Sequence, residues 1–199
     1  MTSMFFRRAP RWVLPLLVVL GLAVPATSAS AAVERFVRFE ENATANWTVT
    51  QACPDGSTAV TRVTVIAGRE LESPDLDDVN TFATVLIRGF DCDGNLINDR
   101  GSGPVAYSSS PSLMEAHVTG TVPLRSGAEA TVDVTWEGTG GLETTVNQTQ
   151  FPGFVGIFTS KTRDAVATGT VVVDGVTLVS GPTSNAEIET LEDRNTTLP

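Results

Sequence analysis

The sequence ATVDVTWEG, residues 130–138, alternates apolar and polar side chains without interruption. Ala130, Val132, Val134 and Trp136 fall on one side of an extended chain, and threonine, aspartate and glutamate fall on the other. A period of two residues is typical of a strand with one face in a core. Threonine and valine also suit a pleated surface. The segment therefore predicts a half-buried β-strand.

Similar composition recurs along the chain. Strands are predicted at 33–40, 46–53, 62–68, 81–90, 116–124, 164–173, 176–180 and 186–192. Asp174-Gly175 predicts a two-residue hairpin turn, which needs positive φ at both positions. No segment carries apolar residues at helical spacing over three turns. Many short strands between turn residues predict an all-β, antiparallel β-sandwich of one domain, with a closed barrel as the alternative.

The architecture resembles immunoglobulin-like sandwiches in general outline only, and a resemblance at that level does not imply a function.

The ends of the chain differ from its middle. Residues 1–31 are predicted to be a secretory signal peptide, because three arginines precede a short apolar stretch, residues 13–24, and a run of small residues then ends in Ala29-Ser30-Ala31. That stretch is shorter than the ~20 residues that span a bilayer. Residues 32–192 are predicted to form the sandwich, and 193–199 a frayed tail. We therefore expect a secreted, extracellular protein with no membrane span once the signal is removed.

The net charge of the chain limits the classes of molecule that it is expected to bind. The whole chain has 13 basic and 23 acidic residues, and residues 1–31 hold three of the arginines and no acid. The remainder has 10 basic and 23 acidic residues and a net charge of −13. Such a surface repels nucleic acid. The expected partner is an unknown extracellular protein or polysaccharide.

The two cysteines, Cys53 and Cys92, each follow a predicted strand and precede an Asp-Gly turn. An up-down-up course of the chain brings both to one end, where thiols in an oxidising compartment pair. First and third strands of a flat meander lie about 9.6 Å apart, whereas a disulfide needs Cα atoms within about 7 Å. The strands therefore face each other from stacked layers, or the cysteines lie in loops. We favour stacked layers, with the bridge at their edge.

The second cysteine lies in a loop with oxygen-bearing side chains. Asp91, Asp93 and Asn95 suit calcium, but the glycine comes one place too early for an EF-hand loop. Aspartate, asparagine and glycine are also common turn residues. We interpret the loop as a turn and keep a calcium site as the alternative. One histidine and two paired cysteines leave too few ligands for structural zinc, so no metal and no cofactor is predicted.

Catalytic residues are not evident. His117, the only histidine, is predicted on an outward strand face, where a Ser-His-Asp arrangement has no support. Asp133 and Glu137 share a strand face, with Glu115 in a neighbouring segment, and a carboxylate pair suits glycoside hydrolysis. Both tryptophans of residues 32–199 are predicted in the core, which leaves no aromatic platform for a sugar. We predict no catalytic residue.

The segment FPGFVGIF, residues 151–158, fits a plain sandwich least well. Phe151, Phe154 and Phe158 form a candidate ligand or partner surface if they are exposed. If they are buried, they cap an open end of the core. We expect burial, because exposed phenylalanine lowers solubility.

The resulting hypothesis is a secreted, non-catalytic binding or surface-associated domain. Recognition would use the loops at one end or the phenylalanine segment. Two alternatives remain: an extracellular hydrolase that acts on a glycan or polymer through acidic residues, and a protease inhibitor that presents a disulfide-held loop.

Overall fold

The computed structural model describes residues 34–72 and 79–197, which belong to one structural unit, Ala31–Pro199. The predicted signal peptide, residues 1–31, lies outside the described residues. Within those ranges no helix is long and apolar enough to cross a membrane.

The described chain consists of antiparallel strands and turns, so the all-β prediction is confirmed. The strands are β1 (Glu34–Ala52), β2 (Thr58–Glu72), β3 (Asn80–Phe90), β4 (Leu96–Pro104), β5 (Ala106–Ser109), β6 (Glu115–Pro123), β7 (Glu129–Gly138), β8 (Glu143–Phe151), β9 (Phe154–Val173) and β10 (Val176–Thr197). Their order is β4-β3-β2-β1-β10-β9-β7-β6-β5, and β8 pairs with β9. The β9–β10 turn has positive φ at Asp174 and Gly175, as predicted.

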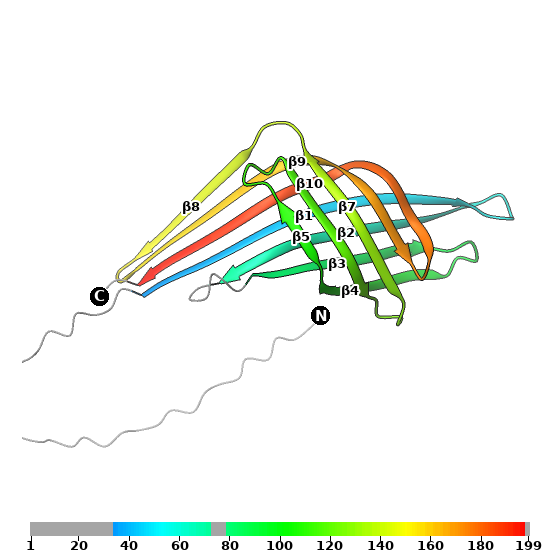
Figure 1. Ribbon diagram of the computed structural model, residues 1–199, viewed down its shortest axis with the longest axis horizontal. Helices are drawn as coiled ribbons and strands as arrows, with labels where there is room; N and C mark the ends of the chain where they lie inside the picture. Colours follow the sequence, from blue (N-terminus) through cyan, green and yellow to red (C-terminus); the bar gives the residue numbers. More distant parts are fainter. Residues whose placement is uncertain (1–33, 73–78, 198–199) are drawn as a thin grey trace, which may run out of the picture. The chain divides into compact units, whose positions relative to one another are not determined.

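This sheet folds over so that β5, β6 and β7 cross β1–β4 in a second layer (Figure 1). The two sheet edges meet at one isolated bridge, Gly101 with Leu124. Next to it, the backbone N–H of Arg125 donates to the carbonyl oxygen of Arg100 at 2.9 Å. No continuous ladder joins the edges among the described strands, so the sheet is not closed into a barrel. The sandwich prediction is confirmed.

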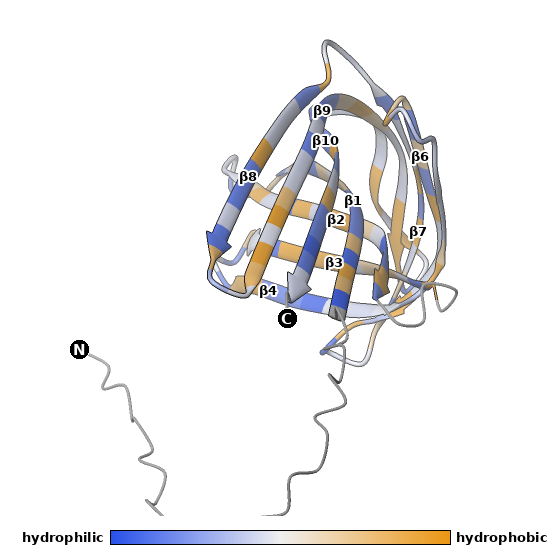
Figure 2. Ribbon diagram, turned by 90° about the vertical axis from the view of Figure 1, so that its left-hand side faces the viewer, coloured by the Kyte–Doolittle hydropathy of each residue, from blue (hydrophilic) through white to orange (hydrophobic). Residues whose placement is uncertain are grey.

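The core lies between the two layers, on what we call the inner face of the sheet. Hydrophobic and hydrophilic residues alternate along the strands (Figure 2). In β2, Val63, Val65 and Ala67 are fully buried on this face. The two tryptophans of the described residues, Trp47 in β1 and Trp136 in β7, are buried there too. This burial confirms the period-two interpretation.

A buried polar cluster sits in the same core. Glu41 is 2% exposed and accepts hydrogen bonds from Arg69 Nη2 at 2.9 Å and Nε at 3.1 Å. The Tyr107 hydroxyl donates to the other carboxylate oxygen at 3.2 Å. Burial, and then the charge of Glu41, raise the pKa of Tyr107 above its ordinary value. Because a buried carboxylate must be paired, the cluster fixes β5 over β1 and β2.

Cys53 and Cys92 form the predicted disulfide, with Cα atoms 5.4 Å apart. The expectation of stacked layers is wrong, because β1 and β3 lie in one layer with β2 between them. The cysteines lie just beyond the last ladder pairs, Ala52 with Thr58 and Phe90 with Leu96. Past those pairs the two chain segments converge over the end of β2.

The end of the chain also differs from the prediction. Residues 193–197 are not a frayed tail but the last part of β10. They pair with β1 on one side and β9 on the other; Asn195, for example, lies opposite both Phe36 and Gly156. Residues 198–199 lie outside the described chain.

Candidate ligand-binding site at the disulfide end

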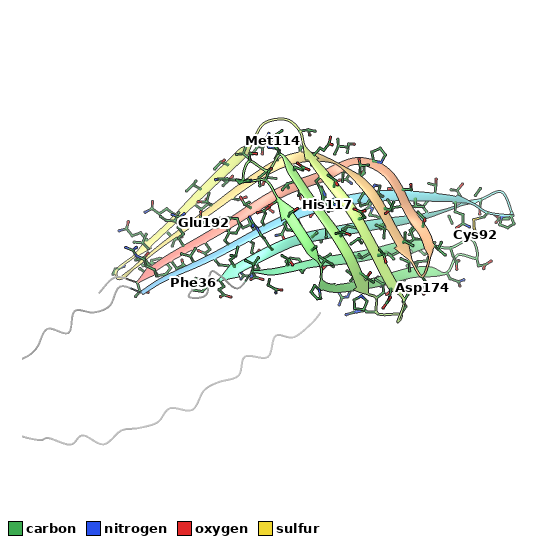
Figure 3. The ribbon with its side chains drawn as sticks, viewed as in Figure 1. Phe36, Cys92, Met114, His117, Asp174 and Glu192 are labelled. Carbon is green, nitrogen blue, oxygen red and sulfur yellow. A yellow bond between two sulfur atoms is a disulfide. The ribbon has the colours of Figure 1, made fainter. Side chains whose placement is uncertain are left out.

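A hollow of about 450 Å³ opens on the inner face at the disulfide end of the sheet. We call it the disulfide-end hollow. Figure 3 shows Cys92 and Asp174 toward this end of the molecule, and Phe36 and Glu192 toward the other. The hollow is lined by β1–β4, the β3–β4 turn and the β9–β10 hairpin, through Val49, Gln51, Ala59, Thr61, Val63, Ile87, Phe90, Asp91, Ile97, Asp99, Val173, Asp174, Val176 and Leu178.

The hollow exists because β10 leaves β1 before β1 ends. Their pairing stops at Ala45, whereas β1 stays paired with β2 as far as Ala52. A register shift between Thr183 and Ala186 marks the bend in β10. Past that bend, the Trp47 indole donates to the carbonyl oxygen of Gly181 at 3.1 Å. The inner-face pattern of β1–β4 thus continues beyond the packed core, and its apolar residues line an open space.

Three carboxylates, those of Asp91, Asp99 and Asp174, line this otherwise mainly apolar hollow, and no lysine, arginine or histidine does. Asp91 Oδ1 accepts from the backbone N–H groups of Asp93 at 2.9 Å and Asn95 at 2.8 Å. Its Oδ2 accepts from the Asn95 side-chain amide at 2.9 Å. Hydrogen bonds, those from Asn95 foremost, hold the pKa of Asp91 below its ordinary value. Asp91 is therefore a fixed anion.

The other two carboxylates are also held by backbone groups. Asp99 Oδ1 accepts from the N–H groups of Arg100 at 2.8 Å and Ser126 at 3.3 Å. Partial burial acts to raise the pKa of Asp99, but these hydrogen bonds outweigh it and the pKa lies below its ordinary value. Asp174 Oδ1 accepts from the N–H of Glu129 at 3.0 Å. The hollow therefore combines apolar walls with oriented negative groups.

The calcium candidates, Asp91, Asp93 and Asn95, fall in the β3–β4 turn beside the hollow. The Asp91 carboxylate is engaged within the turn by the other two residues. The searched part of the chain contains no group of three or more His, Cys, Asp or Glu residues placed to hold a metal. Turn formation accounts for the contacts of these three residues.

The phenylalanine segment lies at the far end of β9 from the hollow. Phe151 and Phe154 face each other across the β8–β9 turn, and Phe158 pairs with Asn147 on the same face. Phe151 is 62% and Phe158 is 38% exposed, and Phe154 is half-buried. The expected burial is therefore wrong, and the three side chains form a surface patch outside the hollow.

His117 lies half-exposed on an outward strand face, as predicted. Its Nε2 is 2.9 Å from Asp133 Oδ1, and Ser108 lies opposite it across the β5–β6 ladder. No hydrogen bond joins Ser108 to His117 within the described residues. Glu115 pairs directly with Glu137 on the same outward face, and both are exposed. Ser108, Glu115 and His117 line a hollow of about 240 Å³ on this outward face, and Asp133 and Glu137 lie exposed outside its lining.

The hollow could not be predicted from the sequence, because part of its lining comes from a strand with no strand-like pattern. Ile97 and Asp99 belong to β4, whose sequence LINDRGSGP is glycine-rich and polar and gives no strand pattern. The pairing of this strand with β3 is what places both side chains on the inner face.

Comparisons with known proteins add little. No protein-family model matches the sequence, and no curated protein matches it. Among solved structures, the crystal structure of a candidate AttH protein from Nitrosomonas europaea matches with 13% sequence identity and a TM-score of 0.29. The match covers 81% of this chain and 52% of that chain, so this chain spans about half the length of that protein. At this level the similarity carries no argument.

Proposed function

We propose that this protein is a secreted binding domain that holds a small amphipathic cation in the disulfide-end hollow. One observation carries the proposal: an apolar hollow of about 450 Å³ is lined by three carboxylates and by no basic side chain. Its size falls within the range of roughly 300–1,000 Å³ typical of small-molecule sites, which are mostly apolar with a few placed polar groups.

Each part of the lining has a role in this proposal. The valine, isoleucine and leucine side chains remove the apolar part of the ligand from water, at about 25 cal/mol per Å². The cationic group lies near Asp91, Asp99 and Asp174, whose carboxylates are already oriented by backbone N–H groups. Because these groups are held in place before binding, little ordering cost is added when the ligand arrives.

The compartment and net charge are consistent with this function. A disulfide persists in an oxidising environment. A net charge of −13 on residues 32–199 attracts cations over a distance limited by salt.

A binding role suits the hollow better than hydrolysis. A glycosidase needs one carboxylic acid with a raised pKa to protonate the leaving group. Asp91 and Asp99 instead have pKa values below the ordinary range. Their geometry favours a permanent anion over a proton donor.

The test is a calorimetric titration with decyltrimethylammonium below its micelle concentration, beside decanol and decanoate. We expect the cation to bind at least about tenfold more tightly than the neutral chain, because the Coulomb attraction between a cation and a carboxylate about 4 Å apart near a protein surface is about 4 kcal/mol before desolvation is subtracted. Val176→Arg places a positive charge at the mouth of the hollow, where Val176 is 62% exposed. It should abolish cation binding.

Val146→Arg is the matched control, because Val146 is a 60% exposed valine on β8. It should bind the cation as the wild type does. Equal affinity for the three probes, or an unaltered affinity in Val176→Arg, would contradict the proposed function.

A further inference from the structure

A second concave surface lies on the outer face of β1–β4, the face opposite the core. We call it the arginine groove. Its volume is about 580 Å³, and its lining is Asn46, Thr48, Val60, Arg62, Thr64, Leu86, Arg88, Gly89, Phe90 and Leu96. It contains no acidic residue, although acidic residues outnumber basic ones 23 to 10 in residues 32–199.

Two arginines lie directly opposite each other in this groove. Arg62 of β2 pairs with Arg88 of β3 in the ladder, and both are exposed. Neither takes part in an ion pair or side-chain hydrogen bond with any part of the chain that the structure describes. Like charges at directly opposed positions destabilise a sheet. Fold stability therefore does not explain why two arginines occupy these opposed positions.

More positive charge lies alongside. A neighbouring hollow shares Leu86 with the groove and is lined by Arg100 and Arg125, again without an acidic residue. Four of the ten basic residues in residues 32–199 thus gather on one face of a strongly acidic protein.

The rest of the groove offers apolar contacts and hydrogen-bond donors. Val60, Phe90 and Leu96 are large apolar side chains exposed to solvent. The Thr64 hydroxyl donates to Asn46 Oδ1 at 2.7 Å. That contact orients the Asn46 amide so that its nitrogen is available as a donor beside the arginines.

We propose that the arginine groove binds a small amphipathic anion, a carboxylate or phosphate monoester that carries an apolar chain. The anionic group is held between the guanidinium groups of Arg62 and Arg88, which suit bidentate contact with such oxygens. The chain lies on Val60, Phe90 and Leu96. Phe90 lines both this groove and the disulfide-end hollow, but no other described residue does. The hollow lies on the inner face and takes the opposite charge.

Two other occupants are disfavoured by charge. A long polyanion reaches beyond the groove and meets the field of a protein with net charge −13. A second copy related by a two-fold axis through the groove sets arginines against arginines. A single anionic headgroup neutralises the pair locally and avoids both problems.

The test is calorimetric titration of the purified protein with decanoate and decyl phosphate, with decanol and decyltrimethylammonium as comparison ligands. We expect both anions to bind and their affinity to fall as salt rises. Arg62→Gln and Arg88→Gln should each weaken anion binding by about tenfold, because each removes a charge-assisted contact. Arg88→Lys, which keeps the charge but loses the planar fork, should weaken it less.

Lys161→Gln is the matched control, because it changes the net charge equally at an exposed site on β9. It should leave anion binding unchanged. Val176→Arg, which blocks the disulfide-end hollow, should also leave anion binding unchanged, so failure of the proposed function and failure of this site are distinguishable.

Backbone NMR shifts locate the ligand. Shifts at 46, 48, 62, 64 and 88, which line the groove alone, are expected without shifts at 173–178. Shifts at 97–99 and 173–178 in place of these would put the anion in the hollow and overturn the proposal. Absence of decanoate and decyl phosphate binding at millimolar concentration would overturn it as well. So would a dimer that Arg88→Gln dissociates, because a second copy would then cover the groove.

Discussion

The indole Nε1 of Trp136 in β7 donates a hydrogen bond of 2.9 Å to the carbonyl oxygen of Thr44 in β1. The two residues are 92 positions apart in the chain and come from opposite layers of the fold. Trp136 is also among the largest fully buried side chains. One side chain thus both fills the space between the layers and sets their relative position.

Replacing Trp136 should destabilise the protein in two separable steps. Trp136→Phe removes the hydrogen bond to Thr44 and part of the volume, and we expect a loss of about 1–3 kcal/mol. Trp136→Ala removes the whole ring, and we expect about 3–5 kcal/mol. Urea unfolding monitored by far-UV circular dichroism measures both. A loss below about 0.5 kcal/mol in Trp136→Phe would mean that the hydrogen bond does not hold the layers together.

Removing one partner of the Glu41–Arg69 pair should lower the free energy of unfolding more than replacing both partners does. Glu41→Gln leaves the Arg69 guanidinium without its carboxylate, which in buried pairs costs about 3–5 kcal/mol. Because the Arg69 side chain is 37% exposed, we expect about 2 kcal/mol. The double variant Glu41→Gln/Arg69→Met should recover much of that loss. A double variant as unstable as the sum of its single changes would show that the two residues act independently.

Removal of the disulfide tests its part in both stability and binding. Cys53 and Cys92 are 39 residues apart, and closing such a loop contributes about 4 kcal/mol in the chain-entropy model. We expect Cys53→Ser/Cys92→Ser to lower the urea midpoint accordingly. Cation affinity should also fall at temperatures where the variant is folded, because the turn that carries Asp91 loses its covalent support. Unchanged cation affinity would show that binding in the hollow does not depend on the disulfide.

The fold class could be predicted because, in a segment that alternates apolar and polar residues, the apolar positions all lie on one face of the strand. Residues 130–138 occupy β7 and bury the expected side chains, including Trp136. The pairing of Cys53 with Cys92 also followed from compartment and spacing. The strand lengths were not predicted correctly: the sequence predicts two strands, at 33–40 and 46–53, with residues 41–45 between them. In the structure β1 runs through them, and Arg69 pairs with Glu41 inside the core.

The candidate site was less accessible to sequence reasoning, since it depends on long-range pairing. Asp99 reaches the hollow because β4 pairs with β3, and Val176 reaches it because β10 bends away from β1. Neither the pairing of β4 with β3 nor the bend of β10 can be recognised from the residues of a short segment. The exposure of Phe151 could not be predicted for a related reason. Among the described strands β8 pairs only with β9, so no second strand covers its end.

Acid should weaken cation binding. The pKa values of Asp91 and Asp99 lie below the ordinary value of 3.8. Their charged forms therefore contribute stability and binding above that pH, and both contributions are lost as pH falls through the lower folded-state values. We expect decyltrimethylammonium affinity to be constant between about pH 5 and 8 and to decline below about pH 4. Asp99→Asn should lower affinity at neutral pH and reduce the acid-dependent loss. A decline already complete at pH 5 would contradict the lowered pKa values.

The opposed arginines predict a stability gain on mutation. Arg88→Gln removes a like-charge contact with Arg62 in the β2–β3 ladder, and we expect the free energy of unfolding to rise by about 0.2–1 kcal/mol. The gain should shrink in high salt, which screens exposed charges. Lys161→Gln provides the comparison at equal net charge, and it should be neutral or slightly destabilising.

If Arg88→Gln gains stability while losing affinity for decanoate, the arginine pair is kept at a cost to the fold, as expected for a binding site. If Arg88→Gln instead loses stability, the two guanidinium groups support the sheet, and the charge-repulsion argument fails.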